Sequence, residues 1–409
     1  MAVIVLQKIS TVMVAVLFVY FAWIIICDVV ALFSRIPKYP KAKASNIAVL
    51  ICARNEENVL GNLLESLRAQ HYPKDKMTVF VVAHNCTDNT AQVAYEHGAT
   101  VFVRNNPDER TKGKALRYGT KMILKKYPGV YDILCVFDAD NLAGKDFLKE
   151  INAAIAGGAD VAQGFRNSKN YYESPVSELF GAYWYQIMIC QNLPHTVMRL
   201  PATIGGTGFG VRMEALGKGW NTKTMIEDIE FSCQMTLKGY RIVLAPDAVF
   251  YDEQPTKLRV GLRQRYRWSA GGYQALKMYF PKLFKAIPRR KGSAVKMMVD
   301  LLINPVLLIS LAGMIMQGVA AGLAGGPQAA VLYALKMAGL CWITVLPATL
   351  ILFIKKRMKP QENIWTIIFF PYFLLLSMVF AVPALLDRNP QWKPVVHSNT
   401  ATLEMMEKQ

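Results

Sequence analysis

The sequence predicts an α/β domain with a mostly parallel sheet, joined to membrane-spanning helices. Between residues 47 and 164, short apolar runs alternate with helical patterns, as in strands connected by crossover helices. Hydrophobic residues make up 53% of the 409-residue chain, and the excess collects in residues 9–33 and in three stretches after residue 297. The middle of the chain has the composition of an ordinary soluble domain.

The first predicted span covers residues 9–33. At a rise of about 1.5 Å per residue, it can cross a hydrocarbon core about 30 Å thick. It is too long for the apolar part of a signal peptide and has no small-residue cleavage site, so we expect an uncleaved anchor. The basic residues Arg35, Lys38, Lys41 and Lys43 follow at once, which places this flank in the cytoplasm and the N-terminus outside.

Four strands and four helices are predicted in the domain that follows. The strands are expected at Ile47–Cys52, Met77–Ala83, Ile133–Phe137 and Asp160–Phe165, and the helices at Asn58–Ala69, Asn89–His97, Gly113–Lys125 and Lys145–Ala156. Parallel sheets bind ligands at the carboxyl ends of their strands. The candidate site residues therefore follow the strands: Arg54, Asn55 and Glu56, then 84–88, then Asp138 and Asp140.

Two segments further along admit two interpretations each. Residues 174–200 are rich in aromatic residues and methionine, which suits either a helix against the membrane or acceptor channel, or an ordinary core helix. Residues 205–212 hold four glycines, which predict a strand or turn that something approaches closely, without the spacing of a phosphate-binding loop or dinucleotide fingerprint.

The C-terminal third reads as a basic amphipathic region and three spans. Residues 257–296 contain twelve Lys or Arg and no Asp or Glu, as in a helix lying in the membrane interface, and Gly271-Gly272 is expected to break or bend it. Spans are expected at about 297–323, 329–354 and 364–386, with the basic loop at 355–359 inside. If each of the three spans crosses the membrane once, the tail lies outside. If Pro371 and Pro383 make the last span a re-entrant hairpin, the tail returns inside. The predicted divisions are therefore an N-terminal transmembrane helix at 1–34, a cytosolic domain at 35–256, a basic interfacial region at 257–296, three transmembrane helices at 297–386 and a tail at 387–409.

Charge and cysteine content narrow the function classes. The formal net charge is +18, which fits a positive-inside bias and attraction to anionic lipid, or an electropositive site for a phosphate-bearing substrate. Nucleic-acid binding is disfavoured because the basic residues cluster beside apolar spans. The seven cysteines are odd in number and form no CxxC pair, so we expect reduced core residues of a cytosolic domain.

Two acidic pairs and one aromatic cluster carry the chemistry. Asp138 and Asp140 follow a buried strand and suit Mg²⁺ or Mn²⁺, which bridges phosphate oxygens, although such a pair alone is a weak signal. Glu227-Asp228 either complements a helix dipole or supplies a general base for an acceptor hydroxyl. The segment 264–268, Gln-Arg-Tyr-Arg-Trp, is either an interfacial aromatic belt or a site for diphosphate and sugar.

Taken together and in this order, these motifs resemble the membrane-bound family 2 glycosyltransferases, which include hyaluronan, chitin-oligosaccharide, poly-N-acetylglucosamine and cellulose synthases. The QxxRW element is the most specific of them. The resemblance rests on Ala53-Arg54-Asn55-Glu56-Glu57, Asn85-Cys86-Thr87-Asp88, Lys112-Gly113-Lys114-Ala115, Asp138-Ala139-Asp140, Gly205-Gly206-Thr207-Gly208, Glu227-Asp228 and Gln264-Arg265-Tyr266-Arg267-Trp268.

The resemblance implies a GT-A fold, an inverting reaction, a UDP-sugar donor and a role for each matching residue. The residues that would contact the donor nucleotide are Arg54, Asn55, Glu56, Asp88, Lys114, Asp138, Gln264 and Arg267. Asp140 and Asp138 would bind the metal, and Trp268, Gly206 and Thr207 would contact the acceptor. Asp228 would act as the catalytic base, with Glu227 as the second catalytic acid. Two departures stand out. Many relatives carry paired acids where this chain has Ala83 and His84, and a threonine where it has Ile226.

Three functions follow as hypotheses. The first is a processive synthase that elongates a β-linked polysaccharide and passes it across the plasma membrane, with its catalytic domain in the cytosol. The second is a glycolipid synthase that adds one or a few sugars to a lipid acceptor. The third is an inactive membrane scaffold or transporter. The expected partners are a UDP-sugar, a polysaccharide or lipid-linked acceptor and membrane lipids, with no nucleic acid, and the chain could form a homo-oligomer.

Overall fold

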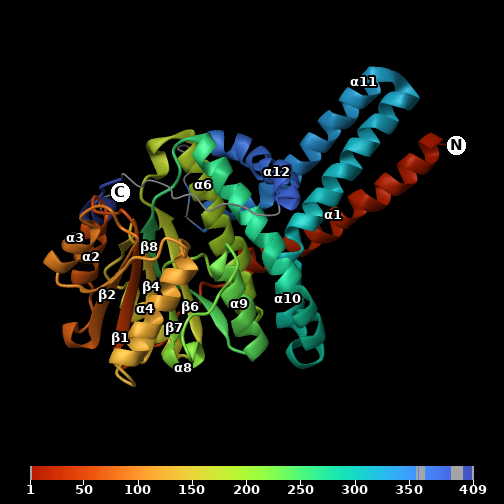
Figure 1. Cartoon of the computed structure of the whole chain (residues 1–409). Coiled ribbons are helices and arrows are strands. Elements are labelled where there is room, and N and C mark those ends of the chain that lie inside the picture. The colour runs from red at the N-terminus through yellow and green to blue at the C-terminus, as the bar shows by residue number, and fades with distance from the viewer. Residues whose placement is uncertain (1, 356–357, 359–363, 388–398, 408–409) are drawn as a thin grey trace.

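The computed structural model describes residues 2–355, 358, 364–387 and 399–407. Its α/β domain carries a projection made of helices α1 (Ala2–Phe33) and α11 (Ile303–Ile354), which lie side by side (Figure 1). Helix α11 is two helical arms that meet at Gly326, where φ is +77°, a value that suits glycine. The arms correspond to the two predicted spans 297–323 and 329–354.

The sheet of the described chain has eight strands in the order β3-β2-β1-β4-β7-β6-β8-β5. Strands β3, β2, β1 and β4 are parallel, and β6 is parallel to β8, whereas β7 is antiparallel to both of its neighbours. The strands are β1 (Ile47–Ala53), β2 (Met77–His84), β3 (Thr100–Arg104), β4 (Ile133–Asp138), β5 (Leu142–Ala143), β6 (Val161–Ser168), β7 (Phe209–Arg212) and β8 (Ile242–Asp252).

Six of the eight strands run in one direction, so the expected mostly parallel sheet is confirmed, and β7 and β5 run the other way. After β6 the chain leaves the carboxyl edge of the sheet and forms α6 (Pro175–Gln186), a π-helical turn at 187–192 and α7 (Leu193–Val197). It re-enters the sheet from that same edge, so β7 must run in the opposite direction. The excursion packs against the apolar helices α1, α11 and α12, as the first interpretation of residues 174–200 requires, and its buried cluster also includes Phe165 and Leu244 of the sheet.

Helices cover both faces of the sheet because its strands are apolar on both sides. Along β1, Ile47, Val49 and Ile51 join one buried cluster, and Ala48 and Leu50 join the other. One face is covered by α2 (Leu60–Arg68), α3 (Thr90–Glu96) and α5 (Phe147–Ala156), and the other by α4 (Lys112–Lys126), α8 (Met213–Leu216) and α9 (Glu227–Lys238). The four helices predicted before residue 157 are confirmed within two residues at each end.

Helix α10 (Leu258–Leu301) is continuous through Gly271-Gly272, so the predicted break there is wrong. The two glycines instead allow close packing: a Cβ on Gly271 would lie 2.7 Å from the Ile226 side chain, and one on Gly272 would lie 2.4 Å from that of Asn304. The non-helical residue is Lys291, with φ of +32°. Two short 3-10 turns at Lys74–Lys76 and Tyr171–Glu173 complete the domain.

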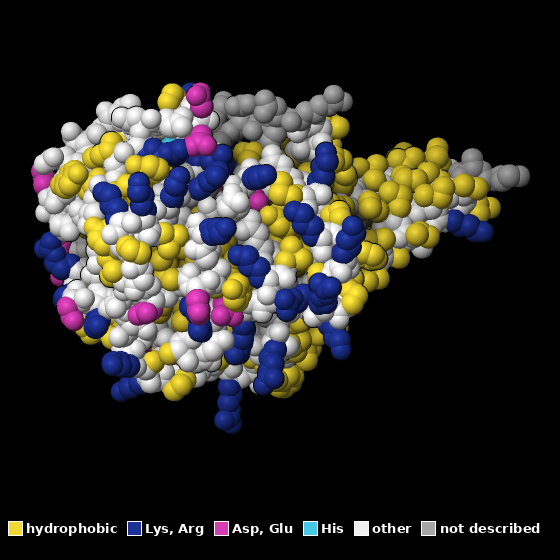
Figure 2. Space-filling view, turned by 60° about the horizontal axis from the view of Figure 1, so that its bottom comes forward, with side chains coloured by type: hydrophobic (Ala, Val, Ile, Leu, Met, Phe, Trp, Pro, Cys, Tyr) yellow, Lys and Arg dark blue, Asp and Glu magenta, His cyan; other side chains and the backbone are white. Residues whose placement is uncertain are grey.

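The projection exposes apolar side chains as a lipid-facing surface would. In the described chain, Ile4–Phe33 and Ile303–Ile354 are long and apolar enough to cross a membrane, and a shorter apolar stretch, Trp365–Leu374, lies in α12 (Ile364–Leu386). Exposed fractions reach 74% at Val19 and 67% at Leu323. Figure 2 shows the projection covered by hydrophobic side chains, with lysines and arginines spread over the adjoining face of the domain.

The tail returns to the α/β domain. Lys169 Nζ donates to the backbone oxygen of Asn399 at 3.0 Å, and Lys145 Nζ lies 2.6 Å from Glu407 Oε2. Helix α13 (Leu403–Glu407) buries Leu403 and Met406. Residues 399–407 therefore contact the α/β domain directly, and 388–398 lie outside the described residues.

Met406→Ala is expected to loosen this attachment. Met406 is 7% exposed, and burying such a side chain stabilises by about 1.5–3 kcal/mol. Hydrogen exchange at residues 399–407, followed by mass spectrometry, should speed up by about tenfold or more. Met405→Ala is the matched control, since Met405 is 56% exposed and should change nothing. Equal exchange in both variants would contradict the docked tail.

Candidate active site

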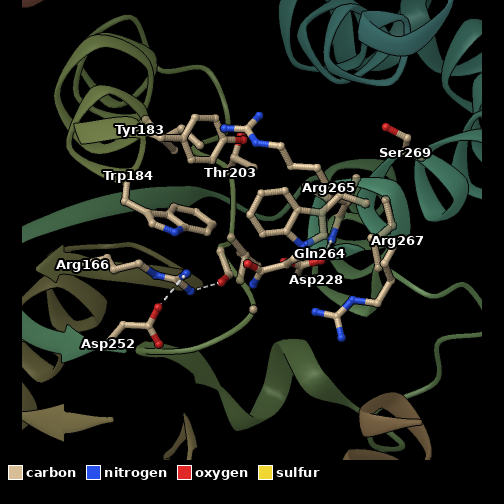
Figure 3. Close-up of a pocket in the computed structure, with 18 of the residues that line it drawn as sticks. Arg166, Tyr183, Trp184, Thr203, Asp228, Asp252, Gln264, Arg265, Arg267 and Ser269 are labelled. Carbon is tan, nitrogen blue, oxygen red and sulfur yellow. Dashed lines mark hydrogen bonds and ion pairs between the residues drawn. The ribbon is translucent and has the colours of Figure 1, made fainter. Parts of the chain in front are cut away.

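A cavity of about 880 Å³ lies between the carboxyl edge of the sheet, α10 and the membrane helices (Figure 3). At one end it is lined by the residues that follow β1 and β4, and at the other by α1, α11 and α12. Among the predicted site residues, the cavity wall includes Arg54, Glu56, Asp138, Asp140, Gly206, Glu227, Asp228, Gln264, Arg267 and Trp268. Segments more than 200 residues apart in sequence therefore meet in one space.

Lys112 connects the two acidic motifs. At the N-terminus of α4, its Nζ forms an ion pair with Asp138, lies 3.9 Å from Glu227 Oε1 and donates to the oxygen of Gly206 at 2.8 Å. Burial alone would lower the pKa of Lys112, but Asp138 and Glu227 outweigh it and raise that pKa. The lysine is thus a fixed positive charge in the acidic part of the cavity.

Asp228 lies in the first turn of α9, beside a glycine that leaves its carboxylate accessible. A Cβ on Gly206, whose φ is +84°, would lie 3.3 Å from Asp228 Oδ2. The other oxygen, Oδ1, accepts from the Ile229 N–H at 2.8 Å. Burial raises the pKa of Asp228, and it raises the pKa of Glu227 to about 7. Both acids therefore hold protons more strongly than free carboxyls do.

An aromatic platform lies at the membrane side of these acids. The Trp268 ring stacks on Tyr183, with centroids 5.9 Å apart and planes 20° apart, and it meets Trp184 edge-on at 5.8 Å. All three rings line the cavity. Aromatic faces of this kind bind the apolar faces of ring-shaped ligands.

Thr207, which was predicted to meet the acceptor, lies inside the protein and not on the cavity wall. It is 1% exposed, and its Oγ1 accepts from the backbone N–H of Asp138 at 2.8 Å and donates to Asn141 Oδ1. Its role is to fix the loop that carries Asp138 and Asp140. Both of these bonds stay inside the protein, so the hydroxyl does not face a ligand in the cavity.

Asn55, Asp88 and Lys114 are also absent from the cavity wall. Asn55 Oδ1 accepts from the Thr87 N–H at 2.8 Å, and the Asp88 carboxylate accepts from Glu57 N at 3.2 Å and Thr90 N at 3.1 Å. These bonds tie together the loops after β1 and β2. Lys114 Nζ instead lies 3.0 Å from Glu109 Oε1. The three residues hold the loops at this edge of the sheet without lining the cavity.

Sequence reasoning missed Arg166 and Asp252, which form a buried ion pair of 3.2 Å on the cavity wall. The Arg166 guanidinium also donates to the oxygen of Gly205 and lies 3.7 Å from the centroid of the Trp184 ring (Figure 3). It thereby orients the aromatic platform and the glycine segment together. The signal available in the sequence was an arginine inside an otherwise buried strand.

Asp138 and Asp140 alone are too few ligands for a hard divalent cation, so a bound phosphate and water would have to complete its coordination. Within residues 2–355, 358, 364–387 and 399–407, no three His, Cys, Asp or Glu side chains form a metal cluster. Asp138 and Asp140 both line the cavity. Mg²⁺ is commonly held by one or two carboxylates, waters and substrate phosphates, so these two residues fit that mode of binding.

A sequence profile described as "Glycosyltransferase like family 2" matches residues 44–271, more than half of the chain. The chain belongs to glycosyltransferase family 2. This glycosyltransferase is also similar in fold to a mannosyltransferase from Pyrobaculum calidifontis solved with GDP-Man and Mn²⁺. The TM-score is 0.63 at 18% identity, covering 94% of this chain and 100% of that one.

Curated relatives of this glycosyltransferase include enzymes of different kinds. It is 26% identical over 278 residues to the probable glycosyltransferase YdaM of Bacillus subtilis, covering 63% of this chain and 62% of YdaM. A beta-monoglucosyldiacylglycerol synthase of Nostoc sp. is 26% identical (58% and 51% covered), and a poly-beta-1,6-N-acetyl-D-glucosamine synthase of Staphylococcus aureus is 25% identical (56% and 55%). The glycosyltransferase thus spans about half to three-fifths of these relatives.

Proposed function

We propose that this enzyme transfers a sugar from a UDP-sugar to a hydroxyl of a growing β-linked saccharide at the membrane, with inversion. The acceptor oxygen forms a bond to the anomeric carbon, the bond from that carbon to the UDP oxygen breaks, and the hydroxyl proton passes to Asp228. The observation that carries this proposal is that Asp228, the aspartate pair and the aromatic platform share one cavity.

The donor would lie at the sheet end of the cavity. Asp138 and Asp140 would hold Mg²⁺ or Mn²⁺, which when bound neutralises charge on the departing diphosphate. Lys112 lies beside the same carboxylates and adds a second positive charge. Gln264 and Arg267 line the wall near Asp228, where a guanidinium can contact phosphate oxygens (Figure 3).

The acceptor would lie at the membrane end. The rings of Trp268, Tyr183 and Trp184 offer stacking surfaces for a sugar, and the cavity continues from them between membrane helices. This supports elongation of a saccharide chain with coupled passage across the membrane. The basic clusters beside the spans support a multi-pass plasma-membrane protein whose catalytic domain is cytosolic.

A glycolipid synthase is the second candidate, favoured by the apolar lining of the membrane end. Leu17, Phe21 and Ile24 of α1 face the cavity together with Leu307 and Val345 of α11. Such a wall suits acyl or prenyl tails at least as well as a hydrated polymer.

Product length separates the two candidates. Purified enzyme in nanodiscs would receive UDP-glucose, UDP-N-acetylglucosamine, UDP-glucuronate or UDP-galactose with Mg²⁺ or Mn²⁺, and products would be sized by mass spectrometry. A ladder of long products supports saccharide elongation, and a single added sugar on lipid supports the second candidate. Free UDP without any glycosylated product would reject both.

Sugar transfer is expected to fall on acidification with a midpoint above that of a free carboxyl. Burial raises the pKa of Asp228 and raises that of Glu227 to about 7. A general base acts only when deprotonated, so kcat/KM should be full above the raised pKa of Asp228 and decline as pH falls through it. The check is a pH profile of kcat/KM from pH 5 to 9. A flat profile down to pH 5 would contradict the buried base.

A further inference from the structure

A second charged group of the cavity has no part in the chemistry above. Lys296 and Asp300 lie one turn apart near the end of α10, where the predicted membrane span begins. Lys296 Nζ is 2.7 Å from Asp300 Oδ2; the lysine side chain is 0% exposed, whereas that of Asp300 keeps 23%. Charged residues at such depth are costly, and they are retained mostly where they face a pathway or a ligand.

Thr203 fixes the position of this pair. Lys296 Nζ donates to Thr203 Oγ1 at 2.9 Å, and that hydroxyl donates to Asp300 Oδ2 at 3.3 Å. The backbone of Thr203 is itself held by the buried Asn192, whose amide accepts from its N–H at 2.8 Å and donates to its oxygen at 2.9 Å. The Asp300 carboxylate is therefore preorganised, because its neighbours cannot move independently.

The strip from Thr203 to Gly206 joins this pair to the base. Thr203, Gly206, Asp228 and Asp300 all line the same cavity. Three residues of chain span at most about 11 Å, so the strip is no longer than that. Asn304, one turn beyond Asp300, donates to the oxygen of Ser269 at 3.2 Å, next to the aromatic Trp268. The pair therefore lies on the acceptor side of the cavity.

The chemistry that Asp300 presents suits neutral hydroxyl groups. A carboxylate accepts strong hydrogen bonds from hydroxyls, and it repels a phosphate. Lys296 has no exposed surface and does not line the cavity, so Asp300 is the member of the pair that a ligand can contact directly.

We propose that Asp300 binds the hydroxyls of a sugar residue already present on the acceptor, with Thr203 and Lys296 as positioning residues. This inference rests on the proposed function and narrows its acceptor to saccharide-headed molecules. A bare lipid alcohol could reach Asp228 but would leave the Asp300 subsite empty.

The test compares acceptors that differ only in their head. Full-length enzyme in nanodiscs, with the UDP-sugar that turns over, would receive an alkyl disaccharide or the alkanol of the same chain length. The wild type should prefer the disaccharide in kcat/KM. Asp300→Asn should lower that preference by about ten- to a hundredfold, mainly through acceptor KM, as expected for lost hydrogen bonds to a charged group.

Lys296→Met/Asp300→Asn separates binding from folding. It removes the buried pair as a unit, so a fold weakened by an uncompensated Lys296 should recover, as a thermal melt would show. The acceptor preference should stay lost. Its recovery in the double variant would overturn the subsite in favour of a structural pair.

Equal use of both acceptors by the wild type would also overturn the subsite. Asp247→Asn, on the exposed part of β8, is the control and should keep the wild-type preference. Absence of any UDP release by the wild type would instead overturn the proposed function, and the subsite with it.

Discussion

Asp228→Asn is expected to lower the rate of sugar transfer by about 10²- to 10⁴-fold, the usual contribution of a positioned general base. The amide keeps the size of the carboxylate but cannot take the acceptor proton. Since Asp228 Oδ1 only accepts from the adjacent Ile229 N–H, the start of α9 should remain folded. The measurement is UDP release under saturating donor, with UDP affinity determined in parallel by calorimetry.

Two variants make this result specific. Asp247→Asn removes an exposed carboxylate outside the cavity wall and should retain wild-type turnover. Glu227→Gln should be less severe than Asp228→Asn, because Glu227 faces Lys112 at the donor end. If Glu227→Gln abolished transfer while Asp228→Asn did not, the base would be Glu227.

Chelation of divalent metal is expected to reduce transfer by on the order of 10³-fold, which corresponds to several kcal/mol of lost charge stabilisation. Neither Lys112 nor the other side chains near Asp138 should replace a cation that contacts the diphosphate directly. Dialysis against EDTA followed by addition of Mg²⁺ or Mn²⁺ should restore activity. UDP affinity, measured with and without Mn²⁺, gives a readout that does not depend on turnover.

The variant Asp140→Asn tests whether the activity lost on chelation comes from a metal bound at Asp138 and Asp140. It should weaken the Mn²⁺ dependence of UDP binding, and a higher Mn²⁺ concentration should restore part of it. Asp146→Asn, at an exposed carboxylate before α5, is the matched control. Full activity of the wild type in EDTA would contradict a metal at Asp138 and Asp140.

The parts of the fold set by local pattern could be predicted from the sequence. Apolar runs such as Ile47–Cys52 predict central strands of a parallel sheet. The polar residues that follow these strands then lie together at the carboxyl edge of the sheet. Most of the candidate site followed from this, including Arg54, Asp138 and Asp140. The membrane helices followed from apolar length alone.

The features that could not be predicted are the direction of a strand and the side to which a side chain points, because both depend on parts of the chain that are distant in sequence. The antiparallel course of β7 follows from where the chain re-enters the sheet, which no local pattern records. Lys114 was predicted to line the cavity, but Lys112 does so instead. Residues two apart on a helix point to different sides, and the sequence did not show which side of the first turn faces the cavity. Thr207 adjoins Gly206 on the wall, yet its side chain points inward.

The attached tail has a practical consequence. Lys169 Nζ donates both to the Asn399 oxygen and, at 2.9 Å, to the backbone oxygen of Asp140, so a single ammonium group joins the segment 399–407 to the aspartate loop. An affinity handle or fluorescent fusion attached through the segment 399–407 would be held beside the loop of Asp138 and Asp140, which we propose holds the metal. Kinetic constants should therefore be measured on protein tagged elsewhere, or after the handle has been cleaved.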